Sequence, residues 1–281
     1  MQIRSITIVL KRGSEAPQRL AGELCSWLAA KSIRVAVDEI TADTDILIIL
    51  GGDGTLLHVA EEASRFGIPV VGVNLGGLGF LTEVAEEECY ETLEAILAGA
   101  VNIEERMMLR GRIEAGGKRS GWRYVLNDIV VSRGSLDRIV QLSAWADGEY
   151  ITTYRADGLI FSTPTGSTAY NLSAGGPIVQ PGLPSILVTP ICPFMLESRP
   201  VLLPPSVRLR TRLADGVANE VKVIVDGQPA WDLRPGDMLE VTASDRPLRL
   251  ISSLRKGYFE ILRNKLNWGG CSGGQPLSGS R

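Results

Sequence analysis

The sequence predicts an α/β fold in about the first hundred residues and a predominantly β fold after them. In the first part, apolar runs of strand type alternate with segments of helical periodicity, which is typical of layered architecture with parallel strands. Two glycine turns follow two of those strands. From about Val101 the chain changes to short strand-like runs separated by Gly, Asp and Pro. A length of 281 residues favours two domains.

The elements of the first part follow from apolar spacing and from turn residues. Leucines at helical spacing follow Pro17, and the helix before Gly99 ends at a typical C-terminal glycine. The expected strands are Ile3–Leu10, Arg34–Val37, Ile46–Leu50 and Ile68–Val73. Helices are expected after Pro17, at Thr55–Phe66 and at Glu86–Ala98.

The second part contains runs of apolar and β-branched residues between turn signals. The expected strands are Tyr124–Ser132, Ile139–Trp145, Val207–Leu213, Val221–Val225 and Leu248–Ile251. Asp226-Gly227 is a strong hairpin signal, and by itself it is equally well explained as a purely structural turn. A last helix is expected at Tyr258–Leu266, before a mobile tail rich in Gly and Ser at 269–281.

Composition excludes several classes of protein. The net charge of −3 and the pI of about 5.4 provide no general basic field for nucleic acid or an acidic membrane surface. No apolar run approaches the roughly 20 residues that cross a bilayer. Four dispersed cysteines and the absence of a signal-type N-terminus predict a cytoplasmic protein. The single histidine, His58, makes His-based zinc sites and a Ser-His-Asp triad improbable.

The first glycine turn, Gly51-Gly52-Asp53-Gly54-Thr55, follows a buried-type strand and opens a helix, which suits an anionic phosphate. A carboxylate at Asp53 would repel that phosphate unless it binds a metal ion or accepts a proton from an attacking hydroxyl. The alternative is that Asp53 only caps the helix. The second turn, Asn74–Phe80, lacks the full dinucleotide fingerprint, and no P-loop or protein-kinase catalytic-loop motif is present.

The run from Thr163 to Pro177 is dense in small and hydroxylated residues, which favours a loop around a polar heterocycle over an exposed linker. Asn127-Asp128 places two polar side chains inside a strand-like run, where either a sugar diol or an edge-strand bulge would explain them. Arg138 and Arg155 bracket these motifs and could neutralise phosphate, although each by itself is more often a solvated arginine.

Taken together and in this order, these motifs resemble the NAD kinases. The matching segments are Gly51–Thr55, Leu78–Phe80, Asn127-Asp128, Arg155–Gly158, Thr163–Pro177, Thr189–Pro193 and Val225–Gln228. The resemblance runs from about residue 45 to about residue 260. The Gly-Gly-Asp-Gly turn alone is also similar to that of phosphofructokinases and lipid kinases, whereas the long Thr163–Pro177 run singles out NAD kinases.

The resemblance implies a phosphotransferase that uses ATP and a divalent metal ion, Mg²⁺ by expectation, to phosphorylate the 2′-hydroxyl of the adenosine ribose of NAD. Asp53 would accept the hydroxyl proton, and Asn127 and Asp128 would hold the ribose. The other residues implied to bind substrate or nucleotide are Gly52, Gly54, Thr55, His58, Phe80, Arg138, Arg155, Asp157, Thr168, Ala169, Tyr170, Asn171, Leu172, Ser173, Asp226 and Gln228. The metal ligands are not identified.

The resemblance further implies a Rossmann-like, phosphofructokinase-type N-terminal domain, a β-sandwich-like NAD-binding domain and a homodimer or homotetramer. The expected boundaries are 1–100 for the first domain, 101–254 for the β-rich domain and 255–268 for a segment returning to the first domain. Asp128 departs from the family pattern, because Glu is common at that position. The rival functions are a lipid kinase, which the acidic pI disfavours, and a non-catalytic NAD-binding regulator, which would not need Asp53.

Overall fold

The computed structural model describes residues 3–134, 139–195, 197–214 and 221–268. The chain divides into two compact units. The first comprises residues 1–56, 68–104 and 250–281, and the second comprises residues 57–67 and 105–249. The helix α2 (Asp53–Phe66) therefore begins in the first unit and continues in the second.

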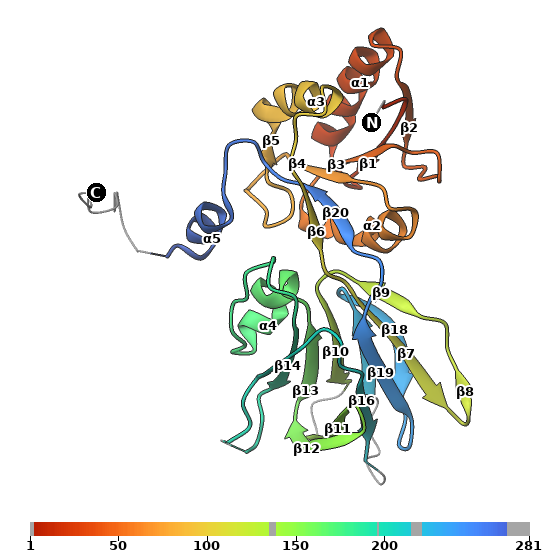
Figure 1. Ribbon diagram of the computed structural model, residues 1–281, viewed down its shortest axis with the longest axis vertical. Helices are drawn as coiled ribbons and strands as arrows, with labels where there is room; N and C mark the ends of the chain where they lie inside the picture. The colour runs from red at the N-terminus through yellow and green to blue at the C-terminus, as the bar shows by residue number, and fades with distance from the viewer. Residues whose placement is uncertain (1–2, 135–138, 196, 215–220, 269–281) are drawn as a thin grey trace, which may run out of the picture. The chain divides into compact units, whose positions relative to one another are not determined.

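The first unit is built on a mostly parallel sheet with the strand order β2-β1-β3-β4-β20-β6, and β5 pairs with β4 (Figure 1). All five residues of β3 are buried, as expected for a central strand covered on both faces. The strands are β1 (Ser5–Leu10), β2 (Arg34–Val37), β3 (Ile46–Leu50), β4 (Val70–Asn74), β5 (Val84–Ala85), β6 (Ile103–Arg106) and β20 (Leu248–Ile251).

Two helices cover one face of this sheet with the apolar side that their spacing predicts. Leu20, Leu24 and Leu28 of α1 (Glu15–Ala30) join the buried core formed by alternate residues of β1 and β3. The helix α3 (Cys89–Leu97), preceded by the 3₁₀ turn η1 (Glu86–Glu88), contributes Leu93 and Ile96 to the same core. Within the described part of the chain, no helix is both long and apolar enough to span a membrane.

The strand β20 differs from the sequence expectation, which assigned it to the β-rich part. It pairs in parallel with β4, at Leu250 and Val70, and so lies between β4 and β6 in the sheet of the first unit. Leu248, Leu250 and Ile251 are all buried, which is the pattern of a strand covered on both faces. The helix α5 (Tyr258–Leu266) follows in the same unit, with the bounds predicted from the sequence.

The second unit is a β-sandwich of two sheets. One has the order β15-β14-β13-β10-β17-β18, and the other has the order β12-β11-β16-β19-β7-β8 with β9 paired to β7. The strands of the first sheet are β10 (Asp128–Arg133), β13 (Gly158–Ser162), β14 (Ile186–Ile191), β15 (Val201–Leu203), β17 (Val221–Val225) and β18 (Gln228–Leu233). Those of the second are β7 (Leu109–Ala115), β8 (Lys118–Arg119), β9 (Arg123–Val125), β11 (Val140–Ala146), β12 (Glu149–Ala156), β16 (Leu209–Leu213) and β19 (Met238–Ala243).

One apolar core joins the two sheets. Ile129, Phe161 and Val223 of the first sheet belong to the same buried cluster as Leu142 and Val241 of the second. These residues alternate along their strands with residues that face away, as sandwich packing requires. The expected α/β unit followed by a β-rich, sandwich-like unit is therefore the observed fold.

Of two local features predicted for the second unit, one is confirmed and the other is not. The hairpin at Asp226-Gly227 is confirmed, because both residues have positive φ (45° and 79°) and join β17 to β18 in a tight turn. The expected single strand Tyr124–Ser132 is instead two strands, β9 and β10, with a break at Leu126-Asn127. The break is stabilised by a carboxylate that is distant in the sequence, as described below.

Candidate active site

Asp53 lies where the first glycine turn enters α2. Its carboxylate oxygen Oδ2 accepts a hydrogen bond from the Phe80 N–H (2.8 Å). Its Oδ1 accepts three more, from the N–H groups of Leu81 and Thr82 and from the Thr82 hydroxyl, each at 3.0 Å. The capping interpretation is wrong, because α2 begins at Asp53 itself and these four donors all belong to the segment 80–82.

The approach of Asp53 to the second glycine turn depends on Gly79. A Cβ atom placed on Gly79 would lie 2.2 Å from Asp53 Oδ1 and 2.2 Å from Thr82 Oγ1, which no side chain tolerates. Asn74 fixes the same turn, since its side chain donates to the Gly77 carbonyl (2.6 Å) and accepts from the Gly76 N–H (2.8 Å). The two glycine turns thus form one hydrogen-bonded assembly around a single carboxylate.

A cavity of about 210 Å³ borders both glycine turns. Four glycines line it, and Lys11, directly after β1, is its basic residue. The lining residues are Lys11, Ser14, Pro17, Gly51, Gly52, Asn74, Leu75, Gly76 and Gly77. An ammonium group beside glycine backbone suits an anionic ligand. Lys11 was not predicted from the sequence, although a basic residue directly after an N-terminal buried strand was the available signal.

In the second unit, the carboxylate of Asp226 binds the break between β9 and β10. It accepts hydrogen bonds from the N–H groups of Leu126 (2.7 Å), Asn127 (2.8 Å) and Asp128 (3.1 Å). Burial raises the pKa of Asp226 to about 6, and the three backbone N–H groups oppose that rise. Asp226 therefore holds the backbone that carries the predicted ribose-binding pair.

The side chains of Asn127 and Asp128 make no hydrogen bond to the described residues, although their backbone is held on both sides. The Asn127 carbonyl accepts from the Thr163 N–H (2.9 Å), and the Asp128 carbonyl accepts from the Asp226 N–H (3.0 Å). Asp128 is only 5% exposed. Burial, and then the neighbouring Asp226, raises the pKa of Asp128 to about 7. A fixed backbone with two unengaged polar side chains suits hydroxyl recognition.

The polar loop Thr163–Pro177 uses much of its hydrogen-bonding capacity on bonds within the protein, both inside the loop and to neighbouring segments. The Thr163 hydroxyl donates to the Leu126 carbonyl (2.6 Å), and the Ser167 hydroxyl accepts from the Val179 N–H (2.9 Å). Asn171 is fully buried, donates to the carbonyls of Ser167 and Pro177 (3.2 Å each), and accepts from the Thr189 hydroxyl (2.6 Å). These contacts explain the unusual composition of the loop.

The remaining predicted residues of this loop lie in the 3₁₀ turn η2 (Thr165–Thr168) and the short helix α4 (Tyr170–Ser173). Tyr170 is 45% exposed and Ser173 is exposed, whereas Thr168, Ala169 and Leu172 are half-buried. Gly166 packs directly on the Asn127 carbonyl, because an added Cβ would lie 2.2 Å from that oxygen. The structure thus brings this loop onto the Asn127-Asp128 segment.

The other residues predicted to bind NAD lie outside this loop. Asp157 pairs with Arg133 (3.1 Å), and the Arg155 guanidinium lies over the Phe194 ring, 5.1 Å from its centroid. Gln228 is exposed at the start of β18. Arg138 lies outside the described residues.

The residues around Asp53 have varied settings. Gly52 is half-buried and Gly54 is exposed. The Thr55 hydroxyl packs so closely on Gly51 that a Cβ there would lie 2.7 Å from its oxygen. His58 is exposed on α2 and lines a cavity of about 280 Å³ with Glu61, Tyr124 and Arg246. Among the described residues, no group of three or more His, Cys, Asp or Glu side chains could hold a metal ion.

Comparison with known proteins identifies similar chains over most of the sequence. Residues 15–101 match the family described as ATP-NAD kinase N-terminal domain, and residues 126–253 match ATP-NAD kinase C-terminal domain. A curated NAD kinase from Syntrophobacter fumaroxidans is 46% identical, covering 95% of this chain and 99% of that protein. One from Geotalea daltonii is 42% identical, covering 89% and 93%.

Two solved structures are similar in fold. Yeast NADH kinase, solved with NADH, superposes with a TM-score of 0.86 at 29% identity, covering 98% of this chain and 91% of that one. An NAD kinase from Archaeoglobus fulgidus, solved with ATP, gives a TM-score of 0.74 at 23% identity, covering 94% and 98%.

Proposed function

This chain belongs to the ATP-NAD kinase family, and from that premise we propose which of its residues carry the reaction. The enzyme transfers a phosphoryl group from ATP to NAD. In our proposal the acceptor is the 2′-hydroxyl of the adenosine ribose, and Asp53 takes its proton. The observation that supports this assignment most directly is the set of hydrogen bonds that orients the Asp53 carboxylate.

The two oxygens of Asp53 differ in their remaining capacity to accept a proton. Oδ1 already receives three hydrogen bonds, whereas Oδ2 receives one. Each carboxylate oxygen has about two lone-pair sites, so Oδ2, with a single hydrogen bond, keeps capacity for one more donor. The four existing bonds also fix the orientation of the carboxylate, which general-base catalysis requires. We therefore assign proton acceptance to Oδ2.

We propose that the cavity lined by Lys11 and the two glycine turns receives the phosphates of ATP. The Lys11 side chain makes no hydrogen bond or ion pair to the described residues, so its ammonium group is free to bind phosphate oxygens. Phosphoryl transfer depends mainly on positioning and on neutralising oxygen charge, and it needs no covalent intermediate on the enzyme. A lysine and glycine amides supply both functions.

Lys11→Met should raise the KM for ATP by about 10- to 100-fold, the usual effect of losing a charged hydrogen bond. The KM for NAD should change by less than about 3-fold, because Lys11 is not among the residues proposed to bind NAD. Lys31→Met is the matched control, since Lys31 pairs with Glu94 on the surface. Steady-state kinetics with each substrate varied will distinguish the two variants. An unchanged KM for ATP would remove Lys11 from the donor site.

Family membership implies that the reaction needs a divalent metal ion, and we propose Mg²⁺. The described residues offer no group of three ligands, but Mg²⁺ in kinases is held by one or two carboxylates together with substrate phosphates. The chain therefore fits a metal that arrives with ATP, with Asp53 as the nearby carboxylate. When bound, this ion would neutralise charge on the phosphate oxygens.

We propose that NAD is held through the side chains of Asn127 and Asp128, whose backbone Asp226 fixes. Asp128 carries its charge above its raised pKa of about 7 and then accepts hydrogen bonds from ribose hydroxyls. Thr168, Ala169, Tyr170, Leu172 and Ser173 would line the nucleotide, and the buried Asn171 would act by shaping the loop. The predicted contacts of His58, Phe80, Arg155, Asp157 and Gln228 stay predictions.

The homodimer or homotetramer and the cytoplasmic location also stay predictions. Phe194, Met195 and Leu202 are 61%, 44% and 48% exposed, and contact with a second copy would cover such apolar side chains. Light scattering on the purified chain gives its mass in solution. A monomer at micromolar concentration would contradict the proposed oligomer.

The direct test of the activity is to incubate the purified protein with NAD, ATP and Mg²⁺ and to follow NADP with an NADP-specific dehydrogenase. Metal-dependent NADP formation is the expected result. Parallel samples with NADH test a second acceptor, which the similarity to yeast NADH kinase favours. Absence of NADP formation, while NAD still binds, would support the non-catalytic regulator instead.

A further inference from the structure

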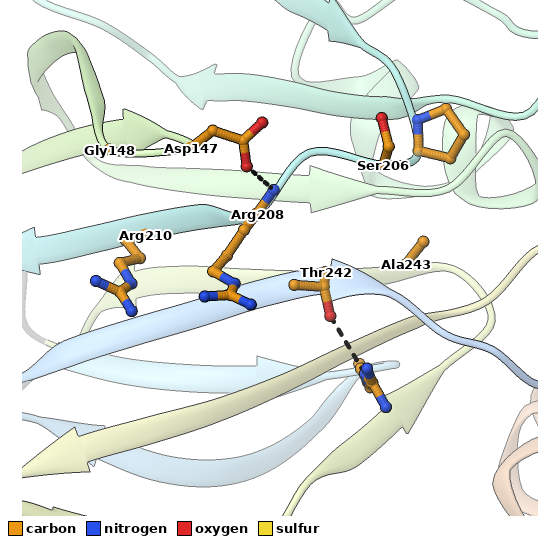
Figure 2. A pocket seen from close by; sticks show the side chains of 9 residues that line it. Asp147, Gly148, Ser206, Arg208, Arg210, Thr242 and Ala243 are labelled. Atoms are coloured by element: carbon orange, nitrogen blue, oxygen red, sulfur yellow. Dashed lines mark hydrogen bonds between the residues drawn. The ribbon is translucent and has the colours of Figure 1, made fainter.

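A cavity of about 530 Å³ lies on the outward face of the second sandwich sheet, over β7, β16 and β19 (Figure 2). Leu209 and Leu213 of β16 point into the core, so Arg208 and Arg210 point away from it. In Figure 2 the Arg208 side chain lies between those of Arg210 and Thr242. The lining residues are Arg110, Asp147, Gly148, Pro205, Ser206, Arg208, Arg210, Thr242 and Ala243.

The arginines converge on one buried carboxylate. Glu240, with a side chain only 7% exposed, forms its shortest ion pair with Arg112 at 3.2 Å. Arg208 and Arg210 lie 3.8 and 3.6 Å from the same carboxylate, beyond hydrogen-bond distance. Within the described residues, neither guanidinium donates a hydrogen bond, although each has five N–H donors. Glu240 therefore gathers these cations without using up their donors.

The rest of the cavity is held in a fixed geometry. Arg110 and Arg112 lie over the Trp122 ring, 4.8 and 4.2 Å from its centroid, and Arg110 Nε donates to the Thr242 hydroxyl (3.2 Å). The Asp147 carboxylate accepts from the Arg208 N–H (2.9 Å), which fastens the turn between β11 and β12 to the start of β16. Such preorganisation lowers the entropic cost of binding a ligand.

We propose that this cavity binds a small molecule bearing phosphate groups. Guanidinium groups match phosphate oxygens through paired N–H donors, and two guanidiniums that donate no hydrogen bond within the described residues can hold one phosphate between them. The volume lies within the range of small-molecule sites. The concave shape favours a small anion over an acidic protein segment.

This site is separate from the proposed kinase site in its residues. It shares no lining residue with the cavity of Lys11 or with the Asn127-Asp128 segment. Its sheet is also different, because Asn127 and Asp128 are continuous with β10 of the other sandwich sheet. The proposal therefore does not depend on which residues carry phosphoryl transfer.

Isothermal titration of the full chain with inorganic tripolyphosphate and, separately, with NADP tests the site and distinguishes a free polyphosphate from a nucleotide. One of the two probes should bind this cavity. For that probe, the double variant Arg208→Gln, Arg210→Gln should raise the Kd of one class of binding site at least 10-fold. The KM of the double variant for ATP, measured by NADP formation, should stay within about 2-fold of the wild-type value. The matched control is Arg19→Gln, Arg119→Gln, which removes the same charge from two surface ion pairs and should change neither result.

Equal binding of both probes by the double variant and the wild type would overturn the proposal. So would a fall in oligomeric mass, measured by light scattering, without any loss of anion binding, because the arginines would then contact a second copy of the chain. A second variant, Glu240→Gln, should keep or strengthen binding of the cognate probe, since it removes the negative charge that competes for the guanidiniums.

Discussion

Asp53 in the first unit and Asp226 in the second are held in the same way but lie in different surroundings. Each follows a buried strand, and each carboxylate accepts hydrogen bonds from three consecutive backbone N–H groups far away in the sequence. The Asp226 carboxylate accepts its hydrogen bonds from the backbone N–H groups of residues 126–128. Oδ2 of each carboxylate receives one hydrogen bond and keeps capacity for another, but Asp53 lies among glycines that border a cavity with a lysine. A carboxylate held by several backbone N–H groups can therefore have a purely structural role. Its surroundings decide whether it can also take part in a reaction.

Gly79→Ala is the most severe way to break the Asp53 assembly. The added Cβ would lie 2.2 Å from Asp53 Oδ1, so the carboxylate or the turn must move. A displacement of this size should lower kcat by about 100-fold or more. Gly22→Ala is the control, because nothing lies within 4 Å of its added Cβ and alanine favours a helix. Full activity in Gly79→Ala would show that the position of Asp53 is not critical.

Asp226→Ala should act mainly on stability. It leaves three N–H groups without their acceptor and places alanine at a positive φ of 45°, which together should cost about 3–5 kcal/mol of unfolding free energy. Asp226→Asn should cost less, because asparagine tolerates this φ and keeps an accepting oxygen. Urea denaturation measures both. If Asp226→Ala kept wild-type stability but lost activity, the contrast with Asp53 would be wrong.

Asp128→Asn should change how stability depends on pH. The folded-state pKa of about 7 exceeds the ordinary value of 3.8, so the contribution of Asp128 is favourable below about pH 4 and is lost as pH rises through 7. The variant should therefore exceed the wild type by about 1–3 kcal/mol at pH 8, and by much less at pH 4.5. The exposed Asp245→Asn serves as control. A pH-independent difference would contradict the burial argument.

The sequence predicted regular elements well where apolar runs are unambiguous. The bounds of β2, β3, β17 and α5 agree with the predicted residues. Leu248–Ile251 was assigned to the wrong part of the chain, because a short apolar run does not reveal which sheet it joins. One of its two neighbours in the sheet, β4, is almost 180 residues earlier in the chain, beyond the reach of local patterns.

The candidate site was less predictable than the fold. The Gly-Gly-Asp-Gly turn indicated Asp53, but nothing local to it indicated that Thr82 would donate two hydrogen bonds to its carboxylate. The polar loop was expected to direct its side chains at a ligand, and Asn171 is instead fully buried by contacts with its own loop and Thr189. Composition identified both segments, whereas the direction of each side chain depends on contacts distant in sequence.

The most direct test of the catalytic role of Asp53 is the kcat of Asp53→Asn, measured with the Kd for NAD and the unfolding free energy of the same protein. Asparagine cannot accept the hydroxyl proton, so kcat should fall by about 10² to 10⁴-fold. The Kd for NAD should stay within about 3-fold and the variant should remain folded. A folded Asp53→Asn enzyme with a near-normal kcat would contradict the assignment of Asp53 as proton acceptor.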